Sequence, residues 1–413
     1  MNRRVLKFGG SNLKDAADIR KLTRAVSCYS TPPLVVVSAL YGITDSLERA
    51  AEGAGRNVDG IYTLIKSLIK QHQQFIDSQI HPERERHRIL QLLTQRILEL
   101  ERILLGCHYL KEVPEFARDQ ILSYGERLSS LLISEILRHH GMKCRECLPE
   151  DIGLVTDGVM TDATVDVEAS RAQVSSALSD GVLTIIPGFY GVSREGKVTL
   201  LGRGGTDYSA AAFAACIKSA SLDIWKDVSG FMSADPKIVR KPVRISRLSY
   251  REAAELSYFG ARILHPRTFE PVMDLGIPVR LYNINDFDNE LTPLTEIVSG
   301  GEVRPGVIKS VTFTRAIGLL TLGGSGVGIR PGLLAAIAGA LHQARINIKS
   351  VFTSQTTINL LLDIKQLSSS RDLIENMRLP TLDEIRISDD IALVAVVGEG
   401  MPDQPGIAAR IFS

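Results

Sequence analysis

Cysteine is scarce in this sequence, and the cysteines that occur follow no pairing pattern. The chain holds 5 cysteines in 413 residues, at positions 28, 107, 144, 147 and 216. An odd number scattered over a long chain is not typical of a disulfide framework. Cys144 and Cys147 have CxxC spacing, but no second pair exists to complete a zinc site. We expect them to be buried thiols on a strand over 141–148, and we expect a reducing cytoplasm as the compartment.

An excess of charge of either sign and a long hydrophobic run are also missing. The 48 Lys and Arg residues nearly equal the 47 Asp and Glu residues, so the formal net charge is +1. Such a chain has no long-range field that attracts nucleic acid or an anionic membrane surface. No run approaches the roughly 18 apolar residues of a membrane span, and the first residues lack the apolar segment of a signal peptide. We therefore expect neither a nucleic-acid partner nor a membrane.

The chain does contain a regular alternation of apolar strands and helices. Its length suggests about two or three domains. The continuous apolar run over 33–39 is typical of a buried parallel strand, and similar runs recur between helical stretches as far as residue 281. This alternation predicts a doubly wound, mainly parallel α/β sheet over residues 1–295. Between about 56 and 140, apolar residues at helical spacing predict a helical insertion.

A glycine-rich turn lies near the middle of the chain, between a predicted strand and a predicted helix of small residues. Residues 200–209 read LLGRGGTDYS. A strand–turn–helix unit of this kind directs backbone N–H groups and a helix N-terminus to one point, where an anion can bind. Arg203 adds a planar guanidinium suited to a carboxylate or phosphate, and Asp207 could hold a metal ion or orient a donor. A plain strand-to-helix turn that uses glycine for positive φ fits the pattern equally well.

Other candidate side chains follow the ends of predicted strands. Lys7 precedes a pair of glycines, where it could reach phosphate oxygens or simply be a surface lysine. Ser38 ends the strand over 33–39, and Thr44 is a plausible N-cap of the next helix. Hydroxyl groups at the carboxyl ends of central strands lie where open α/β sheets bind ligands. Glu126 lies in a helical stretch over 114–138, as a surface acid or, in a cleft, as a ligand for an ammonium group.

The last quarter of the chain contains an internal repeat. A strand, a glycine-rich loop, a Pro-Gly pair and a helix occur around Pro331-Gly332 and again around Pro405-Gly406. The repetition predicts two copies of one small α+β module over 306–413, after a linker near 292–304. The second copy stops soon after Ile411, so we expect a longer protein or a partner to complete it.

Together these stretches resemble the aspartate kinases of the amino-acid-kinase family. The resemblance spans nearly the whole chain, because the family's motifs occur in family order: KFGG, VVVSA, GE, GFYG, LGRGGTDYSA, IWKDVSG, ADP and ELSYFGARILHPRT. The closing repeat resembles the paired, ferredoxin-like ACT domains that bind regulatory amino acids. The resemblance implies a homo-oligomer, formed as a dimer through these modules, with lysine or threonine as the regulatory ligand.

The resemblance also implies a reaction and a set of roles. ATP with Mg²⁺ would phosphorylate the side-chain carboxylate of L-aspartate, the first step towards lysine, threonine and methionine. Lys7 and Asp207 would be catalytic, and no metal-ligating set is assigned in the protein itself. Arg203 would bind the α-carboxylate of aspartate and Glu126 its ammonium group. The remaining expected substrate contacts are Ser38, Thr44, Phe189 and Thr206. The expected nucleotide contacts are Lys7, Gly9, Gly10, Ser11, Gly204, Gly205, Lys226, Asp227, Met232, Lys237 and Arg262.

Several departures from the family pattern leave alternatives open. Lys226 stands where threonine is common, and Met232 stands where tyrosine is common. Lys237 stands where arginine is common and Arg262 where lysine is common, so both positions keep a positive charge. A non-catalytic, amino-acid-sensing subunit is one alternative. A sibling kinase acting on glutamate, N-acetylglutamate or carbamate is another, although recognition of a free ammonium would be wasted on an acetylated substrate. The chain could also be the first half of a bifunctional aspartokinase and homoserine dehydrogenase.

Overall fold

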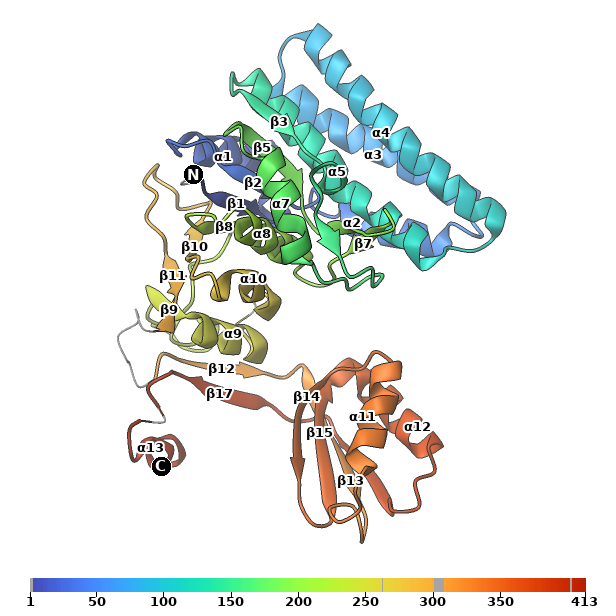
Figure 1. Cartoon of the computed structure of the whole chain (residues 1–413), viewed down its shortest axis with the longest axis vertical. Coiled ribbons are helices and arrows are strands. Elements are labelled where there is room, and N and C mark those ends of the chain that lie inside the picture. Colours follow the sequence, from blue (N-terminus) through green and yellow to red (C-terminus); the bar gives the residue numbers. More distant parts are fainter. Residues whose placement is uncertain (1–2, 262, 301–307, 402) are drawn as a thin grey trace. The chain divides into compact units, whose positions relative to one another are not determined.

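A mainly parallel eight-stranded sheet organises the first of two compact units (Figure 1). The computed structural model describes residues 3–261, 263–300, 308–401 and 403–413. Unit 1 comprises residues 1–258, 262–309 and 398–413. In spatial order the strands of its sheet are β3 (Cys144–Glu146), β5 (Leu183–Pro187), β2 (Leu34–Val37), β1 (Val5–Phe8), β8 (Leu222–Lys226), β10 (Val279–Asn283), β11 (Thr295–Val298) and β9 (Arg247–Ser249).

The inner strands are short, apolar and fully buried, as expected for a parallel sheet covered on both faces. Every residue of β1, β2 and β5 is buried. Strand β1 pairs in parallel with β2 and with β8, and among the described strands of this sheet only β10 and β11 pair in antiparallel fashion. The predicted doubly wound α/β architecture is confirmed.

Helices cover the sheet, and one of them begins directly after the glycine-rich turn. Asp15 caps the first helix, because its carboxylate accepts hydrogen bonds from the N–H groups of Ala17 and Asp18. Helix α8 is buried along its whole length, which its alanine-rich sequence permits. The helices of unit 1 are α1 (Ala16–Ser27), α2 (Ile43–Gly53), α3 (Val58–Gln79), α4 (Glu83–Leu110), α5 (Glu115–His139), α6 (Pro149–Ile152), α7 (Val167–Ala177), α8 (Gly205–Cys216), α9 (Tyr250–Phe259), α10 (Glu270–Met273), α13 (Ile407–Phe412) and the 3₁₀ segments η1 (Gly10–Asn12) and η2 (Pro266–Phe269).

The predicted helical insertion consists of two long helices and a third that belongs to the core. Helices α3 and α4 pack side by side, and α4 also packs against α5 (Figure 1). Helix α5 differs from them, because residues 121–137 are all buried and the helix also packs against β2, β3 and β5. The segment 115–139 therefore covers the sheet and carries Glu126 inward, rather than forming part of a peripheral insertion.

A small three-stranded sheet is formed by segments that precede the glycine-rich turn along the chain. It contains β4 (Val155–Thr156), β6 (Tyr190–Ser193) and β7 (Val198–Leu200), with β6 and β7 forming an antiparallel hairpin. Buried hydroxyl groups of Thr156 and Thr199 hydrogen-bond at 2.7 Å between β4 and β7. This sheet fixes the end of β7, from which the turn into α8 starts.

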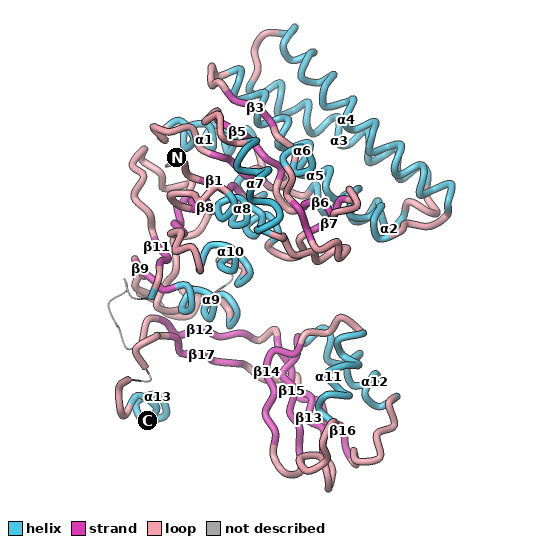
Figure 2. Tube along the Cα trace, viewed as in Figure 1, coloured by secondary structure: helices cyan, strands magenta, loops and turns pink. Residues whose placement is uncertain are grey.

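Unit 2 comprises residues 259–261 and 310–397 and has its own apolar core. Its larger sheet is fully antiparallel, with helices α11 (Leu333–Gln343) and α12 (Leu367–Asn376) (Figure 2). Leu320, Ile337 and Leu360 are fully buried in this core. The strands are, in spatial order, β14 (Ile348–Thr353), β15 (Thr357–Asp363), β13 (Ile317–Gly323) and β16 (Glu384–Ser388), and the separate pair β12 (Ser310–Thr314) and β17 (Leu393–Val397).

The two Pro-Gly pairs of the sequence repeat have the same backbone shape. Gly332 precedes α11 with φ +86°, and Gly406 precedes α13 with φ +85°, so both Pro-Gly pairs start a helix in the same way. Strand β17 of the second copy pairs with β12 rather than with a sheet of its own copy. The linker expected over 292–304 instead contains strand β11, which pairs with β10 and β9. Residues Thr295, Ile297 and Val298 of β11 are buried, which explains why this part of the chain forms a strand. Positions 301–304 of the predicted linker lie outside the described residues.

Two further sequence predictions concern the membrane and the cysteines. Within the described ranges, no helix is long and apolar enough to cross a membrane. The five cysteines are free thiols. Cys144 is buried on β3 as expected, whereas Cys147 is only partly buried because it follows the end of that strand.

Candidate active site

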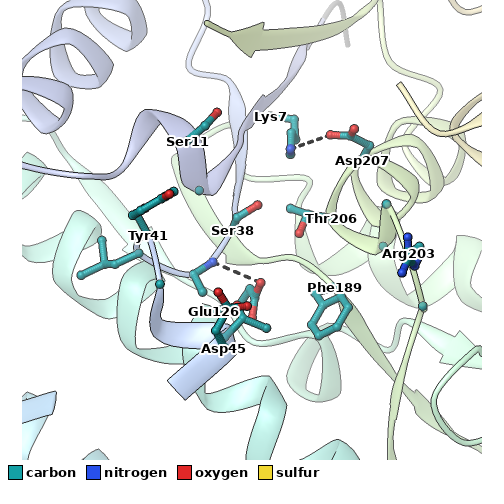
Figure 3. A pocket seen from close by; sticks show the side chains of 18 residues that line it. Lys7, Ser11, Ser38, Tyr41, Asp45, Glu126, Phe189, Arg203, Thr206 and Asp207 are labelled. Atoms are coloured by element: carbon teal, nitrogen blue, oxygen red, sulfur yellow. Dashed lines mark hydrogen bonds and ion pairs between the residues drawn. The ribbon is translucent and has the colours of Figure 1, made fainter. Parts of the chain in front are cut away.

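A cavity of about 420 Å³ opens at the carboxyl ends of β1 and β2, beside the first turn of α8 (Figure 3). This edge of an open α/β sheet is the usual ligand-binding position. The predicted site residues that line the cavity are Lys7, Gly10, Ser11, Ser38, Thr44, Glu126, Phe189, Arg203, Gly204, Gly205, Thr206 and Asp207. They come from segments far apart in the sequence, which the sheet brings together.

Lys7 and Asp207 form an ion pair at one end of the cavity. The distance from Lys7 Nζ to Asp207 Oδ1 is 2.6 Å, and both residues are buried. Lys226 Nζ lies 3.2 Å from the other carboxylate oxygen, Oδ2. Burial alone would raise the pKa of Asp207, but the two ammonium groups outweigh it and lower the pKa to about 2. Asp207 is therefore a carboxylate at neutral pH, held at the N-terminal turn of α8, where negative charge is favourable.

Glu126 lies on the opposite side of the cavity from this ion pair (Figure 3). Its Oε1 accepts a hydrogen bond of 3.1 Å from the N–H of Ala39. Its Oε2 is buried and has no hydrogen-bond partner among the described residues. Burial raises the pKa of Glu126 to about 8, against an ordinary value of 4.5. A buried carboxyl group with an unused oxygen facing a cavity is suited to bind a cationic group.

Gly125 explains how α5 brings Glu126 so close to the second strand. A Cβ atom on Gly125 would lie 2.9 Å from Cβ of Ala39, a distance that real Cβ atoms essentially never show. The Gly-Glu pair therefore has a steric reason: the glycine lets the helix approach, and the glutamate then reaches the Ala39 N–H group.

The glycine-rich turn has the backbone shape that the sequence suggested. Gly202 and Gly204 have φ values of +68° and +71°, and Gly204 is the N-cap of α8. A Cβ on Gly204 would lie 2.4 Å from Cβ of His265, and one on Gly205 would lie 2.8 Å from the ring of Phe189. The glycines are required by the turn, and the turn lines the cavity with Arg203 exposed at its rim. Anion binding at this turn stays a prediction.

Phe189 is held in a backbone conformation that non-glycine residues rarely adopt. Its φ is +73°, and its N–H donates to Ser209 Oγ at 3.2 Å. Gly188 next to it is crowded, since a Cβ there would lie 2.4 Å from Cγ2 of Thr206. The left-handed residue and the close approach together place the Phe189 ring in the cavity wall, as Figure 3 shows.

The turn is also held from outside the cavity, by residues that sequence reasoning did not single out. The guanidinium of Arg267 pairs with Asp162 at 2.9 Å and donates to the carbonyl oxygen of Leu201 at 3.3 Å. Asp119 on α5 accepts hydrogen bonds from the N–H groups of Thr161 and Leu200. These contacts fix β7 and the start of the turn. Arg267 lies within the ILHPRT motif, so its position in the motif was the available signal.

Other predicted site residues lie outside the cavity wall. A Cβ on Gly9 would lie 3.1 Å from Lys7 Nζ, so Gly9 leaves room for the ammonium group. Asp227 accepts a hydrogen bond of 3.0 Å from Ser11 Oγ, which ties η1 to the end of β8. Met232 forms an isolated bridge with Arg244, and Lys237 is exposed in the turn after Asp235. Arg262 lies outside the described residues.

The structure adds cavity residues that the sequence analysis missed and corrects one expectation. The added lining residues are Ala39, Leu40, Tyr41, Gly42, Asp45 and Gly202. Thr44 is not the N-cap of α2, which begins at Ile43 after Gly42 with φ +79°. The reason is that Gly42 adopts the left-handed conformation needed for the turn, which leaves Thr44 in the first helical turn. Thr44 nevertheless lines the cavity.

The site and the fold define a class of protein. The chain belongs to the amino acid kinase family, whose sequence model matches residues 2–283. It is 29% identical over 420 residues to the lysine-sensitive aspartokinase 3 of Escherichia coli, covering 99% of this chain and 90% of that protein. It is 30% identical to the chloroplastic aspartokinase 3 of Arabidopsis thaliana, covering 95% of this chain and 69% of that protein. Within the family this chain is an aspartate kinase.

Solved structures agree with the sequence relatives. The E. coli aspartokinase III in complex with lysine and aspartate matches with a TM-score of 0.81 and 26% identity, over 96% of this chain and 87% of that one. The same enzyme in complex with aspartate and ADP matches with a TM-score of 0.79 and 27% identity, over 99% of this chain and 90% of that one. The similarity therefore extends over both compact units.

Proposed function

We propose that this aspartate kinase transfers the γ-phosphoryl group of ATP to the side-chain carboxylate of L-aspartate, giving ADP and 4-phospho-L-aspartate. The observation that carries the proposal is the arrangement of one cavity, with the Lys7–Asp207 ion pair at one end and the buried Glu126 at the other. The E. coli relative that holds aspartate and ADP has the same fold. In metabolism this would be the first step towards lysine, threonine and methionine.

The chemistry of the acceptor explains why the cavity needs cations and not a general base. A side-chain carboxylate of aspartate has an ordinary pKa near 3.9, so it is already ionised at pH 7. The difficulty is to bring two anions together and to stabilise charge on the γ-phosphoryl oxygens during transfer. Lys7, held by Asp207, supplies a fixed positive charge, and the first turn of α8, after Gly205, supplies backbone N–H groups.

Charged side chains would orient the substrate by binding its α-carboxylate and its ammonium group separately. Arg203 at the rim would bind the α-carboxylate, because its planar guanidinium matches two carboxylate oxygens. Glu126 would bind the ammonium group and would lose its proton on doing so, since the nearby cation stabilises the carboxylate. Ser38, Thr44, Phe189 and Thr206 would complete the pocket. This orientation would direct the side-chain carboxylate towards Lys7.

The nucleotide would bind beyond Lys7, between η1 and the end of β8. The proposed contacts are Gly9, Gly10, Ser11, Gly204, Gly205, Lys226, Asp227, Met232, Lys237 and Arg262. No group of three or more His, Cys, Asp or Glu residues suited to a metal ion occurs in the described part of the chain. Mg²⁺ seldom uses such cages, and is usually held by phosphates, waters and one or two carboxylates. The exposed carboxylate of Asp227 fits an ion of this kind, which would neutralise phosphate charge when bound.

The closing repeat supports a regulatory role. Residues 306–413 would form paired amino-acid-binding modules, with lysine or threonine as the ligand, and would join two copies of the chain. The E. coli aspartokinase III structure is a complex with lysine as well as aspartate. Inhibition of turnover by each amino acid would identify the ligand.

A substrate panel tests the reaction. ADP formation from ATP would be measured with L-aspartate, L-glutamate, N-acetyl-L-glutamate and carbamate as acceptors. We expect turnover with L-aspartate, and at least about tenfold less kcat/KM with N-acetyl-L-glutamate, since that substrate offers no ammonium to Glu126. Turnover with the acetylated acceptor equal to that with aspartate would overturn the proposal.

A further inference from the structure

The side chain of Lys226 contacts Asp207, as that of Lys7 does, but it comes from the neighbouring strand β8. Strands β1 and β8 pair in parallel, with Lys7 opposite Ile224. Since alternate residues of a strand point to the same face, Lys226 points to the face of the sheet that carries Ile224 and Lys7. It is thus the diagonal neighbour of Lys7, one strand away, and helix α8 covers both strands from this side.

The contacts of Lys226 show a shared carboxylate. Asp207 binds one ammonium on each oxygen, Lys7 at 2.6 Å on Oδ1 and Lys226 at 3.2 Å on Oδ2. Lys226 Nζ also donates to the carbonyl oxygen of Ile263. A lysine has three N–H donors. Among the described residues these contacts occupy two of them, and the side chain remains 19% exposed.

The charges of this cluster do not cancel. Lys7 and Lys226 contribute two positive charges and Asp207 one negative charge, so the cluster carries one net positive charge. Lys7 alone would be enough to neutralise Asp207 if the role of the cluster were structural. An unbalanced charge in a largely buried place is costly without a counter-ion. The net positive charge of the cluster favours the binding of an anion.

We propose that Lys226 is a second phosphoryl-binding cation of this kinase, held beside Lys7 by Asp207 so that both ammonium groups contact the transferred phosphoryl group. This inference rests on the proposed function and goes beyond it, since a nucleotide contact alone would not require Lys226 to share Asp207. Two cations on one phosphoryl group would stabilise the charge that spreads over its oxygens during transfer.

Kinetics of matched variants test the proposal. Lys226→Met removes the charge with little change in length, Lys226→Arg keeps the charge, and Lys197→Met removes an exposed lysine on the β6–β7 turn as a control. We expect Lys226→Met to lower kcat by about 10²-fold with less than about threefold change in KM for aspartate. Lys226→Arg should recover part of the loss, and Lys197→Met should match the wild type. A kcat of Lys226→Met equal to that of the control would overturn the proposal.

A binding measurement keeps the test independent of turnover and of folding losses. The affinities of wild type and Lys226→Gln for ADP and for a non-hydrolysable ATP analogue would be compared by calorimetry. If Lys226 contacts the terminal phosphate, Lys226→Gln should weaken binding of the ATP analogue at least about tenfold more than binding of ADP. Equal weakening of both, or no weakening, would contradict the role of Lys226. If the wild type binds both nucleotides but never phosphorylates aspartate, the proposed function fails. The binding comparison still decides whether Lys226 contacts the terminal phosphate, because it does not depend on turnover.

Discussion

Lys7 and Asp207 are 200 residues apart in the sequence, yet their side chains form an ion pair of 2.6 Å in which only 7% and 6% of the side-chain surface is exposed. Burial lowers the pKa of Lys7, and the charge of Asp207 opposes that shift. Each residue thus depends on the other to remain charged in a place that excludes most water. The pair joins the first strand to the glycine-rich turn and sets the position of the proposed phosphoryl transfer.

Replacement of Lys7 should abolish most of the activity. Lys7→Ala removes the fixed cation at the cavity end, so we expect kcat to fall by about 10²-fold or more. Asp207 keeps Lys226 as a partner, so the protein should still fold, which circular dichroism would check. Lys197→Ala, on an exposed turn, is the control and should leave kcat unchanged. Near-normal turnover of a folded Lys7→Ala protein would rule out the assigned role.

Glu126 should make the stability of the protein fall with rising pH. Its pKa is raised to about 8 by burial, so between pH 4.5 and about 8 the folded protein holds a proton that the unfolded chain has released. The contribution of this group is present below pH 4.5 and is lost as the pH rises through about 8. Glu126→Gln should flatten this slope in denaturant titrations at pH 5, 6.5 and 8. The exposed control Glu195→Gln should keep it, and an unchanged slope in Glu126→Gln would contradict the assignment.

Binding of aspartate should release a proton. In the free protein at pH 7 the raised pKa keeps Glu126 mostly protonated, and an ammonium group beside it would favour the carboxylate. The apparent affinity for aspartate should therefore rise towards about tenfold per pH unit between pH 6 and 7, and should level off above pH 8. Calorimetry in buffers of different ionisation enthalpy would measure the released proton directly. An affinity that does not vary over this range would show that the ammonium group binds elsewhere.

Two glycine substitutions in long helices should have opposite effects. Gly106→Ala on α4 places a Cβ in open space, so we expect a gain of about 0.5–1 kcal/mol in unfolding free energy from helix propensity. Gly125→Ala on α5 forces a Cβ to 2.9 Å from Ala39, so we expect a loss of about 1–3 kcal/mol and a higher KM for aspartate. Denaturant titrations of both variants check this. Equal gains in unfolding free energy in both variants would show that α5 can move away from Ala39 without loss of stability.

The sequence was sufficient to predict much of the scaffold, because buried parallel strands leave a strong local signal. The apolar runs that became β1, β2 and β5, the glycine turn before α8 and the Pro-Gly repeat all follow from short-range preferences. Many of the motif residues, although not all, also line one cavity, since the carboxyl ends of parallel strands share an edge.

The remaining features depend on contacts between distant segments. The sharing of Asp207 by Lys7 and Lys226 requires the register of β1 against β8 and the rotation of α8, which no local pattern contains. Tyr41 and Asp45 line the cavity because Gly42 turns the chain there, and they carry no motif of their own. The segment of strand β11 resembles a linker in sequence because proline and glycine flank it, whereas its pairing with β9 and β10 depends on distant residues.

The most direct test is the product formed by the purified protein. ATP, Mg²⁺ and L-aspartate would be incubated with the wild type and with Lys7→Ala, and the acyl phosphate would be followed by ³¹P NMR and trapped with hydroxylamine as the hydroxamate. We expect an acyl phosphate on the side chain of aspartate, formed with the wild type and reduced about 10²-fold or more in the variant. A wild-type protein that binds ATP and aspartate but forms no acyl phosphate would contradict it.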